Sequence, residues 1–400
     1  MLTLDRVYQA AHILKGVVRK TDLILSSNIV PDCELYLKAE NLQITGSFKV
    51  RGAYFKISML SEEEKAKGVI ACSAGNHAQG VALAAQNSGI AATIFIPSTA
   101  PLSKIEATKR MGAQIRLIDG VYDDAYDAAC VYQQESGGIF VHPFDDIDVI
   151  AGQGTIGLEI LEQIPGLDAV IVPVGGGGLI SGVAFAVKML NPACKVYGVQ
   201  AVGAGSMYDS FRDKKREGLT KVSTFADGIA VKMPGANTYE YCTQYVDEIV
   251  TVSDDEIATA VLALMEQQKL VAEGAGAVAV AAAMFNKLPI AGKKVCVIVS
   301  GGNIDVNILA RVINRGLLTT GRLSELKLEM IDKPGQLKEV SAIIAGMGAN
   351  VTKVLHNPGG ENTDINGCYL HISMETKNKD HFLDIKRTIQ NAGYKIVEEQ

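Results

Sequence analysis

The chain has 400 residues, of which 48% are hydrophobic and 20% charged, enough for several folded cores and too apolar for a disordered protein. Its 38 basic residues are outnumbered by 44 acidic ones, and the net charge of −6 without a long basic run argues against a nucleic-acid partner. The seven cysteines include no CxxC pair, which favours free thiols over disulfides or a zinc site. No apolar run reaches the roughly 20 residues of a membrane span and no signal-peptide pattern occurs, so we expect a soluble cytoplasmic protein without a membrane partner.

Short β-branched runs alternate with helical patterns over most of the chain. The strand-like runs are residues 69–72, 92–97, 114–119, 139–142, 169–174, 195–200 and 293–299, and the helical patterns between them include 78–87 and 103–111. Strands that are apolar on both faces and separated by helices predict a mostly parallel α/β sheet. Glycines follow several of these strands, and ligands of such sheets bind at the carboxyl ends of strands.

The pattern changes near residue 320. The remainder predicts strand 324–331, helix 336–347, strand 349–356, loop 357–366, strand 367–375, helix 379–391 and strand 393–398. Apolar residues alternate with polar ones after Cys368, which indicates a strand buried on one face. The order βαββαβ is that of a ferredoxin-like sandwich, so we expect a first region over 1–320 and a separate domain over 321–400.

Four consecutive glycines, Gly175 to Gly178, follow the strand at 169–174 and lead into an apolar helix with Leu179. Glycines allow close backbone approach, and N–H groups at a helix start favour an anion, so we expect a phosphate here; a tight turn alone needs only one glycine. A dinucleotide site is disfavoured, because the third glycine of G-x-G-x-x-G is missing and Gln200 stands where a ribose-binding acid is expected.

Two further motifs offer chemical groups beside glycine-containing turns. Lys49 follows Phe48 after a Gly-Ser turn, and a lysine becomes a nucleophile when its amine is desolvated; the alternative is an ordinary surface lysine. Ser300 begins Ser-Gly-Gly-Asn at the end of the strand at 293–299, and its alternative role is that of a turn residue.

The segment from Ser73 to His77 also joins a strand to a helix. Its composition suits a loop that presents N–H groups to a carboxylate. Asn76 could instead cap the helix, and His77 could be a packed core histidine rather than an acid or base.

Together these four segments resemble the pyridoxal-phosphate β-family, the fold-type II enzymes, and within it the threonine dehydratases (threonine ammonia-lyases). The resemblance covers residues 1–320, with a small lobe over 46–154 and a large lobe formed by the remainder. The tail resembles an ACT domain, whose ligand loop matches 332–337 and whose second strand matches 348–351. The resemblance implies conversion of L-threonine to 2-oxobutanoate and ammonia by β-elimination, with activity on L-serine; a serine dehydratase or serine racemase of the same fold is the alternative.

The resemblance also implies roles for individual residues around pyridoxal 5'-phosphate. Lys49 would hold the cofactor covalently and then take the substrate's Cα proton. Asn76 would hydrogen-bond the cofactor's 3′ oxygen, Phe48 would pack against its ring, and Ser300 would face its pyridine nitrogen. The phosphate would be held by the backbone of Gly175, Gly176, Gly177, Gly178 and Leu179. The substrate carboxylate would be held by Ser73, Ala74, Gly75, Asn76 and His77.

Two departures favour elimination over racemisation. Serine racemases of this family carry a proton-transferring Ser where this chain has Ala74. They also place metal-binding carboxylates after the strand that ends here at Gln200, whereas residues 200–206 contain no acid, so we expect no required metal. A nicotinamide oxidoreductase is disfavoured by the failed glycine pattern, and a non-catalytic amino-acid sensor by intact Lys49, Asn76 and Ser300.

The family further implies a homo-oligomer, dimeric or tetrameric, with a small allosteric effector at the tail. Isoleucine, valine and nucleotides are all compatible with the tail, and the sequence does not separate a role in isoleucine biosynthesis from a catabolic one.

Overall fold

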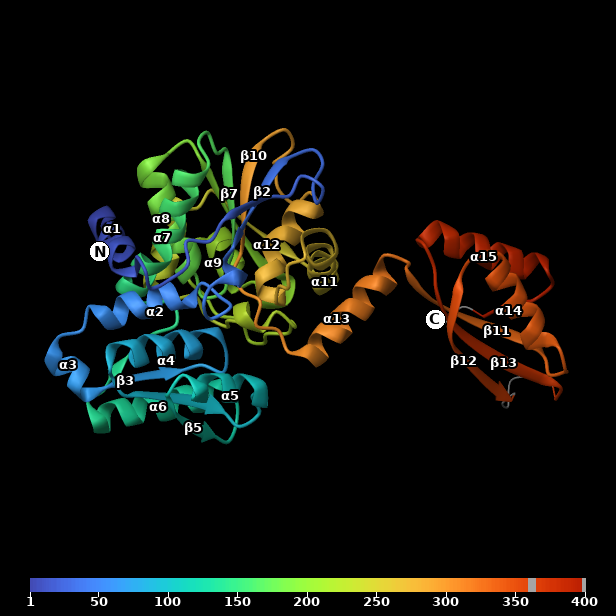
Figure 1. Ribbon diagram of the computed structural model, residues 1–400, viewed down its shortest axis with the longest axis horizontal. Coiled ribbons are helices and arrows are strands. Elements are labelled where there is room, and N and C mark those ends of the chain that lie inside the picture. Colours follow the sequence, from blue (N-terminus) through green and yellow to red (C-terminus); the bar gives the residue numbers. More distant parts are fainter. Residues whose placement is uncertain (359–364, 398–400) are drawn as a thin grey trace. The chain divides into compact units, whose positions relative to one another are not determined.

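The computed structural model describes residues 1–358 and 365–397. The chain forms two compact units, Met1–Leu309 and Ala310–Gln400 (Figure 1). The division falls inside α13 (Val306–Thr319), somewhat before the expected boundary at residue 320. No helix in the described part of the chain is long and apolar enough to cross a membrane.

A six-stranded sheet forms the centre of the first unit, in the order β1-β2-β10-β7-β8-β9. All neighbours are parallel except the β1–β2 pair. The strands are β1 (Leu23–Leu25), β2 (Glu34–Ala39), β7 (Ala169–Pro173), β8 (Lys195–Ala201), β9 (Glu248–Val252) and β10 (Lys294–Val299). The expected parallel sheet is confirmed, and β1, β2 and β9 are strands that the sequence analysis did not identify.

A second, smaller sheet has four parallel strands in the order β5-β4-β3-β6. They are β3 (Val69–Cys72), β4 (Ala92–Pro97), β5 (Gln114–Ile118) and β6 (Ile139–Phe140). The predictions for β3 and β4 are confirmed, whereas β6 stops two residues before the expected end at His142. This sheet has its own apolar core with α2 and α4, so it forms a distinct lobe within the first unit.

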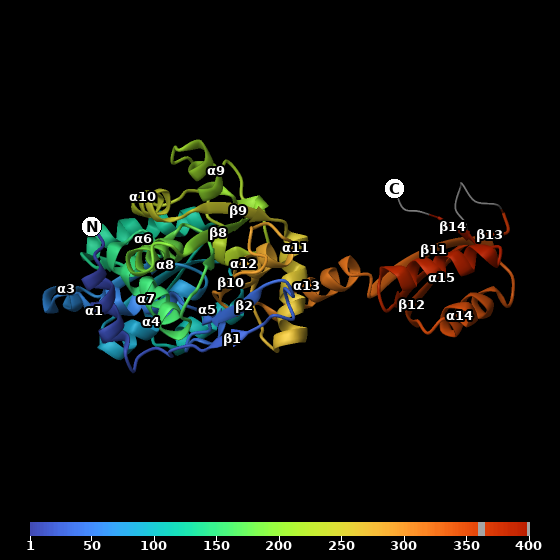
Figure 2. The same ribbon diagram turned by 90° about the horizontal axis from the view of Figure 1, so that it is seen from above.

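Helices cover both faces of the central sheet. Alternate residues of β7, such as Val170 and Val172, share a core with α7 and α8, and α12 packs on the sheet from the other side (Figures 1 and 2). Every residue of α12 from Gly274 to Ala283 is buried, as expected for its uninterrupted apolar sequence. The helices of this unit are α1 (Leu4–Leu14), α2 (Lys49–Ser58), α3 (Glu62–Lys67), α4 (Asn76–Ser88), α5 (Leu102–Arg110), α6 (Tyr122–Ser136), α7 (Ile147–Gln163), α8 (Gly178–Leu190), α9 (Ser206–Asp213), α10 (Ala236–Tyr245), α11 (Asp254–Ala263) and α12 (Gly274–Met284). Short turns η1 (Glu40–Leu42), η2 (Val202–Ala204), η3 (Asp227–Ile229) and η4 (Leu264–Gln268) complete it.

The second unit contains an antiparallel sheet in the order β12-β13-β11-β14. Its strands are β11 (Leu323–Ile331), β12 (Asn350–Pro358), β13 (Gly367–Glu375) and β14 (Lys395–Ile396), and its helices are α14 (Gln336–Gly346) and α15 (Lys379–Asn391). Buried residues of both helices join one face of the sheet in a single core, which confirms the ferredoxin-like βαββαβ order. Of the expected loop 357–366 and strand 393–398, residues 359–364 and 398 lie outside the described residues.

Candidate active site

The site lies where β10, β7 and β3 end and the next segments begin. The backbone N–H of Phe48 donates to the carbonyl of Ser300 at 3.1 Å, and Ser47 pairs with Gly301 in a short antiparallel bridge. Asn303 donates to the carbonyl of Thr45 at 2.7 Å and strengthens the same junction. Two of the motifs, distant in sequence, are therefore held together by backbone hydrogen bonds.

Lys49 begins α2 and is only partly exposed. Its Nζ donates to the carbonyl of Pro143 at 2.8 Å and lies 5.3 Å from the centre of the Phe48 ring. Loss of hydration lowers the pKa of the Lys49 amine to about 8, although the charge of Glu273 opposes the shift. This environment excludes a freely hydrated surface lysine and yields an amine that is easily made neutral.

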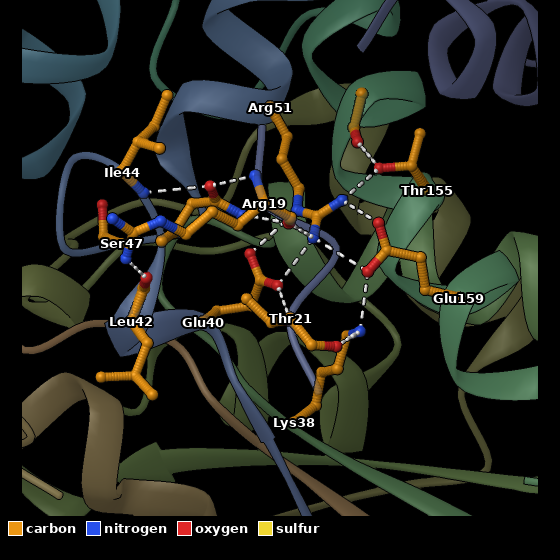
Figure 3. A network of polar contacts seen from close by, with 12 residues as sticks. Arg19, Thr21, Lys38, Glu40, Leu42, Ile44, Ser47, Arg51, Thr155 and Glu159 are labelled. Atoms are coloured by element: carbon orange, nitrogen blue, oxygen red, sulfur yellow. Dashed lines mark hydrogen bonds and ion pairs between the residues drawn. The ribbon is translucent and has the colours of Figure 1, made fainter. Parts of the chain in front are cut away.

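A buried ionic network anchors α2 just beyond Lys49 (Figure 3). The fully buried guanidinium of Arg51 donates to Glu40 with two nitrogens, both at 2.8 Å, and to Glu159 on α7 at 2.6 and 3.0 Å. Lys38 of β2 donates to the same Glu159 carboxylate at 2.7 Å. The network ties α2, α7 and the central sheet together and thereby fixes the place where Lys49 emerges.

The four glycines form the turn between β7 and α8. Gly177 has φ of +98°, a left-handed conformation that favours glycine, and a Cβ added there would lie 2.8 Å from Thr238 Cβ. Thr238 donates to the carbonyl of Gly176 at 2.6 Å, and the buried Gln200 donates to that of Gly175 at 3.4 Å. Gln200, noted in the sequence for its position, thus supports the glycine turn from behind.

The N–H groups of this turn are available to a ligand. Those of Gly175 to Leu179 have no acceptor within residues 1–358 and 365–397, and α8 has no side-chain cap. Unpaired N–H groups at the start of a helix carry partial positive charge and bind anions. The turn therefore fits a phosphate group, as the sequence predicts.

The segment from Ser73 to His77 turns from β3 into α4. Asn76 donates to Glu273 at 2.7 Å and accepts from Asn303 at 2.8 Å, so its amide is held in one orientation. His77 is buried, its Nε2 lies 2.8 Å from the Val141 carbonyl, and burial lowers its pKa to about 3. His77 is thus neutral near pH 7, and its hydrogen bond favours the packed histidine over the acid or base. Helix α4 has no side-chain cap either, so Asn76 does not cap it in this way.

Ser300 is buried beside this junction, and its Oγ donates to the carbonyl of Ala275 at 3.2 Å. It carries no charge, so a basic ring nitrogen placed against it would accept a hydrogen bond from the Ser300 hydroxyl, turned from the Ala275 carbonyl, rather than meet a carboxylate. The turn role and a ligand role for Ser300 are compatible in this geometry.

Glu273 is the principal site residue that the sequence analysis missed. It precedes α12, is buried, and holds Asn76, while burial raises the pKa of its carboxyl to about 7. In the sequence it looks like an ordinary acid at a helix start. The carbonyl of Pro143 was missed, and so was Phe144, whose ring lies against Gly176 and whose backbone lies against Gly178. Neither contact has a sequence signature.

A desolvated lysine and a glycine turn with unpaired N–H groups together fit an aldehyde cofactor that carries a phosphate. The family of pyridoxal-phosphate dependent enzymes matches residues 14–301, which include all of these residues. The chain belongs to this family. Its cofactor is pyridoxal phosphate, and its fold is that of the fold-type II enzymes.

Individual relatives are consistent with membership of this family. An L-threonine ammonia-lyase of Thermotoga maritima is 52% identical over 398 residues, covering 99% of each chain, and one of Geobacter sulfurreducens is 42% identical with the same coverage. Among solved structures, threonine deaminase isoform 2 of Solanum lycopersicum is 39% identical with a TM-score of 0.73, covering 78% of this chain and 94% of that one. Maize serine racemase is 36% identical with a TM-score of 0.75 and covers 80% of this chain and 98% of its own.

Proposed function

We propose that this enzyme is an L-threonine ammonia-lyase that forms 2-oxobutanoate and ammonia and also accepts L-serine. The observation that carries the proposal is the 52% identity to an L-threonine ammonia-lyase over 99% of both chains. The desolvated Lys49 and the anion-binding turn at Gly175–Leu179 support it, since β-elimination needs a base at Cα and a firmly held cofactor.

Each group of residues in the site has a separate role in this reaction. Pyridoxal phosphate, when bound, withdraws electrons from Cα of the amino acid and so weakens the Cα–H bond. Lys49 would hold the cofactor, and its desolvated amine, whose pKa is lowered to about 8, would accept the Cα proton. The glycine turn would hold the phosphate, Phe48 would pack against the ring, and Asn76, fixed by Glu273, would donate to the ring oxygen.

The substrate carboxylate is assigned to the segment from Ser73 to His77. The start of α4 has no side-chain cap, which leaves its N–H groups for an anion. Ser300 would face the pyridine nitrogen as a neutral group, which would keep electron withdrawal moderate and favour elimination.

Racemisation of serine is the second candidate, and the maize serine racemase likeness is its support. Reprotonation on the opposite face of Cα needs a second acid. Ala74 occupies the position assigned to that acid and has only a methyl group, so elimination is the better supported reaction.

Steady-state assays of the holoenzyme with L-threonine and L-serine test the proposal, with 2-oxo acid, ammonia and D-serine measured separately. Lys49→Ala is expected to lose both the visible absorbance of the bound cofactor and turnover, whereas Lys67→Ala, in the exposed α3, should retain both. Normal threonine deamination by Lys49→Ala would refute the mechanism, and D-serine as the main product would favour the racemase.

For the second unit we propose an ACT-type regulatory role. Its ferredoxin-like fold supports this, and the loop at 332–337 leads from β11 into α14, where the effector is assigned. Strand β12 is a long edge strand, and such edges are normally covered, so pairing of two copies in a dimer or tetramer would protect it. We expect truncation after Gly321 to keep threonine deamination but abolish its response to isoleucine, valine, AMP or ADP.

We also propose a cytoplasmic location. The support is that all seven cysteines are free thiols, as expected in a reducing compartment.

A further inference from the structure

Three side chains with metal-ligating atoms converge at one end of the sheet in the second unit. The carboxylate of Asp332, the imidazole of His356 and the thiol of Cys368 have ligand atoms within 4.8 Å of one another. They are the only such group of three or more among the residues that the structure describes. The first two are exposed and the thiol is buried, so an ion could enter from solvent and meet the sulfur on its inner side.

The sheet register brings these residues together. Cys368 lies on β13, between Met330 of β11 and Pro358 of β12. Directly opposed residues point to the same face of a sheet, as do residues two apart on one strand. Asp332 and His356, each two positions from a neighbour of Cys368, therefore share its face, and the backbone N–H of Asp332 is fixed by the carbonyl of Asn366 at 2.7 Å.

The separations are close to those of a metal site. Bond lengths of about 2.0–2.3 Å in a tetrahedral zinc centre put ligand atoms roughly 3.3–3.8 Å apart. His356 Nε2 and Asp332 Oδ1 are already 3.2 Å apart, so only small side-chain rotations are needed to enclose an ion. A hydrogen-bonded surface pair accounts for Asp332 and His356, and packing in the apolar core accounts for the burial of Cys368, but neither requires the thiol to lie within 4.8 Å of that pair.

We propose that Asp332, His356 and Cys368 bind one Zn²⁺ ion, with a fourth position left to water or to a ligand of the regulatory unit. Nitrogen, sulfur and oxygen donors in one tetrahedral set match zinc better than calcium or magnesium, which take oxygen ligands. Without a cation, burial and the charge of Asp332 raise the pKa of the Cys368 thiol. Zinc binds the thiolate, so binding releases one proton from this residue.

The proposal differs from the expectation that the chain needs no metal. That expectation rests on cysteine spacing and on residues 200–206, whereas this cluster joins residues on β12 and β13 with one just after β11, which spacing along the chain does not reveal. It shares Asp332 with the proposed effector loop, so zinc binding is measured without any amino acid or nucleotide present.

The test uses the full-length holoenzyme, stripped of metals and dialysed against Zn²⁺, with bound zinc measured by elemental analysis. We expect one zinc per chain for the parent and for the control His371→Ala, which changes a histidine three residues after Cys368, on the opposite face of β13. His356→Ala and Cys368→Ser should each weaken binding by more than about 100-fold, the upper end of the loss caused by outer-sphere changes.

Co²⁺ provides an independent readout in the visible region. A cobalt–thiolate centre should give intense tetrahedral ligand-field bands in the parent that disappear in Cys368→Ser. Cys368 is buried, so Cys368→Ser could lose zinc by unfolding. His356 is exposed, so zinc binding by His356→Ala tests the site directly, provided that its circular dichroism matches that of the parent. Absence of stoichiometric zinc in the parent, or equal zinc in the parent and His356→Ala, overturns the proposal, and neither result bears on threonine deamination.

Discussion

Replacing Arg51 by Met should destabilise the first unit far more than its single position in α2 suggests. The guanidinium is fully buried and shared by Glu40, itself fully buried, and Glu159. Met fills similar volume without charge, so the change leaves the Glu40 carboxylate in the interior without its arginine partner. The hydrogen bond from Thr21 at 2.6 Å remains but supplies no charge.

The magnitude follows from this loss. Removing one member of a buried ion pair costs about 3–5 kcal/mol, mainly because the other charge is left uncompensated. Such a cost is a large part of the roughly 5–15 kcal/mol by which native domains are stable. At roughly 2–4 °C per kcal/mol, the melting temperature should fall by about 6–20 °C. If the unpaired Glu40 carboxylate causes the loss of stability, the double variant Arg51→Met/Glu40→Gln should lose less free energy of unfolding than the two single variants lose in sum.

Urea unfolding followed by circular dichroism measures these free energies in the full-length protein, and cofactor content and kcat are measured in parallel. Arg212→Met is the matched control, because Arg212 is an exposed arginine paired with Asp209 and Asp213, and it should change stability by less than about 0.5 kcal/mol. Turnover should fall in Arg51→Met, since the start of α2 carries Lys49. A cost comparable to that of Arg212→Met, or strict additivity with Glu40→Gln, would refute this account.

Three other changes test the site. Gly177→Ala should weaken cofactor binding at least tenfold, because φ is +98° and Thr238 blocks the Cβ, whereas Gly166→Ala, at φ +71° in open space, should leave cofactor titrations unchanged. Ser300→Asp should slow threonine deamination at least about tenfold, equivalent to about 1.4 kcal/mol, and parent-like kinetics would show that Ser300 does not face the ring. The pKa of Glu273 is about 7 rather than 4.5, so the folded protein retains a proton that the unfolded chain loses, and stability should fall as pH rises between these values. In Glu273→Gln, the free energy of unfolding measured in urea should lose roughly 3 kcal/mol of this pH dependence. An unchanged pH profile in that variant would contradict the raised pKa of Glu273.

The sequence was sufficient for strands that are apolar throughout and for motifs built on glycine. Strand β2 escaped notice because Lys38 lies in it, and a buried lysine becomes acceptable only through Glu159, which belongs to a helix far along the chain. Strand β9 follows α10 closely and fully buries only Ile249 and Val252, so it lacks the uninterrupted apolar pattern of β7.

The same limit applies to the site. Lys49, Asn76 and the glycine turn can be recognised in the sequence by residue type and by their position just before or at the start of a helix. Glu273 and the Pro143 carbonyl are defined only by what the folded chain brings near them. Residues whose role depends on long-range packing, rather than on local conformation, are those that the sequence did not reveal.

The position of β10 between β2 and β7 also determines when this enzyme can first become active. During synthesis, β2 and β7 emerge long before residues 294–299, so until then both have an unpaired edge in the middle of the future sheet. The partner of Phe48 and Ser47, at Ser300 and Gly301, emerges later still. A nascent chain that stops before residue 300 can therefore form the small lobe, but it cannot close the junction that holds Lys49, and cofactor capture must wait for nearly the whole first unit to be made.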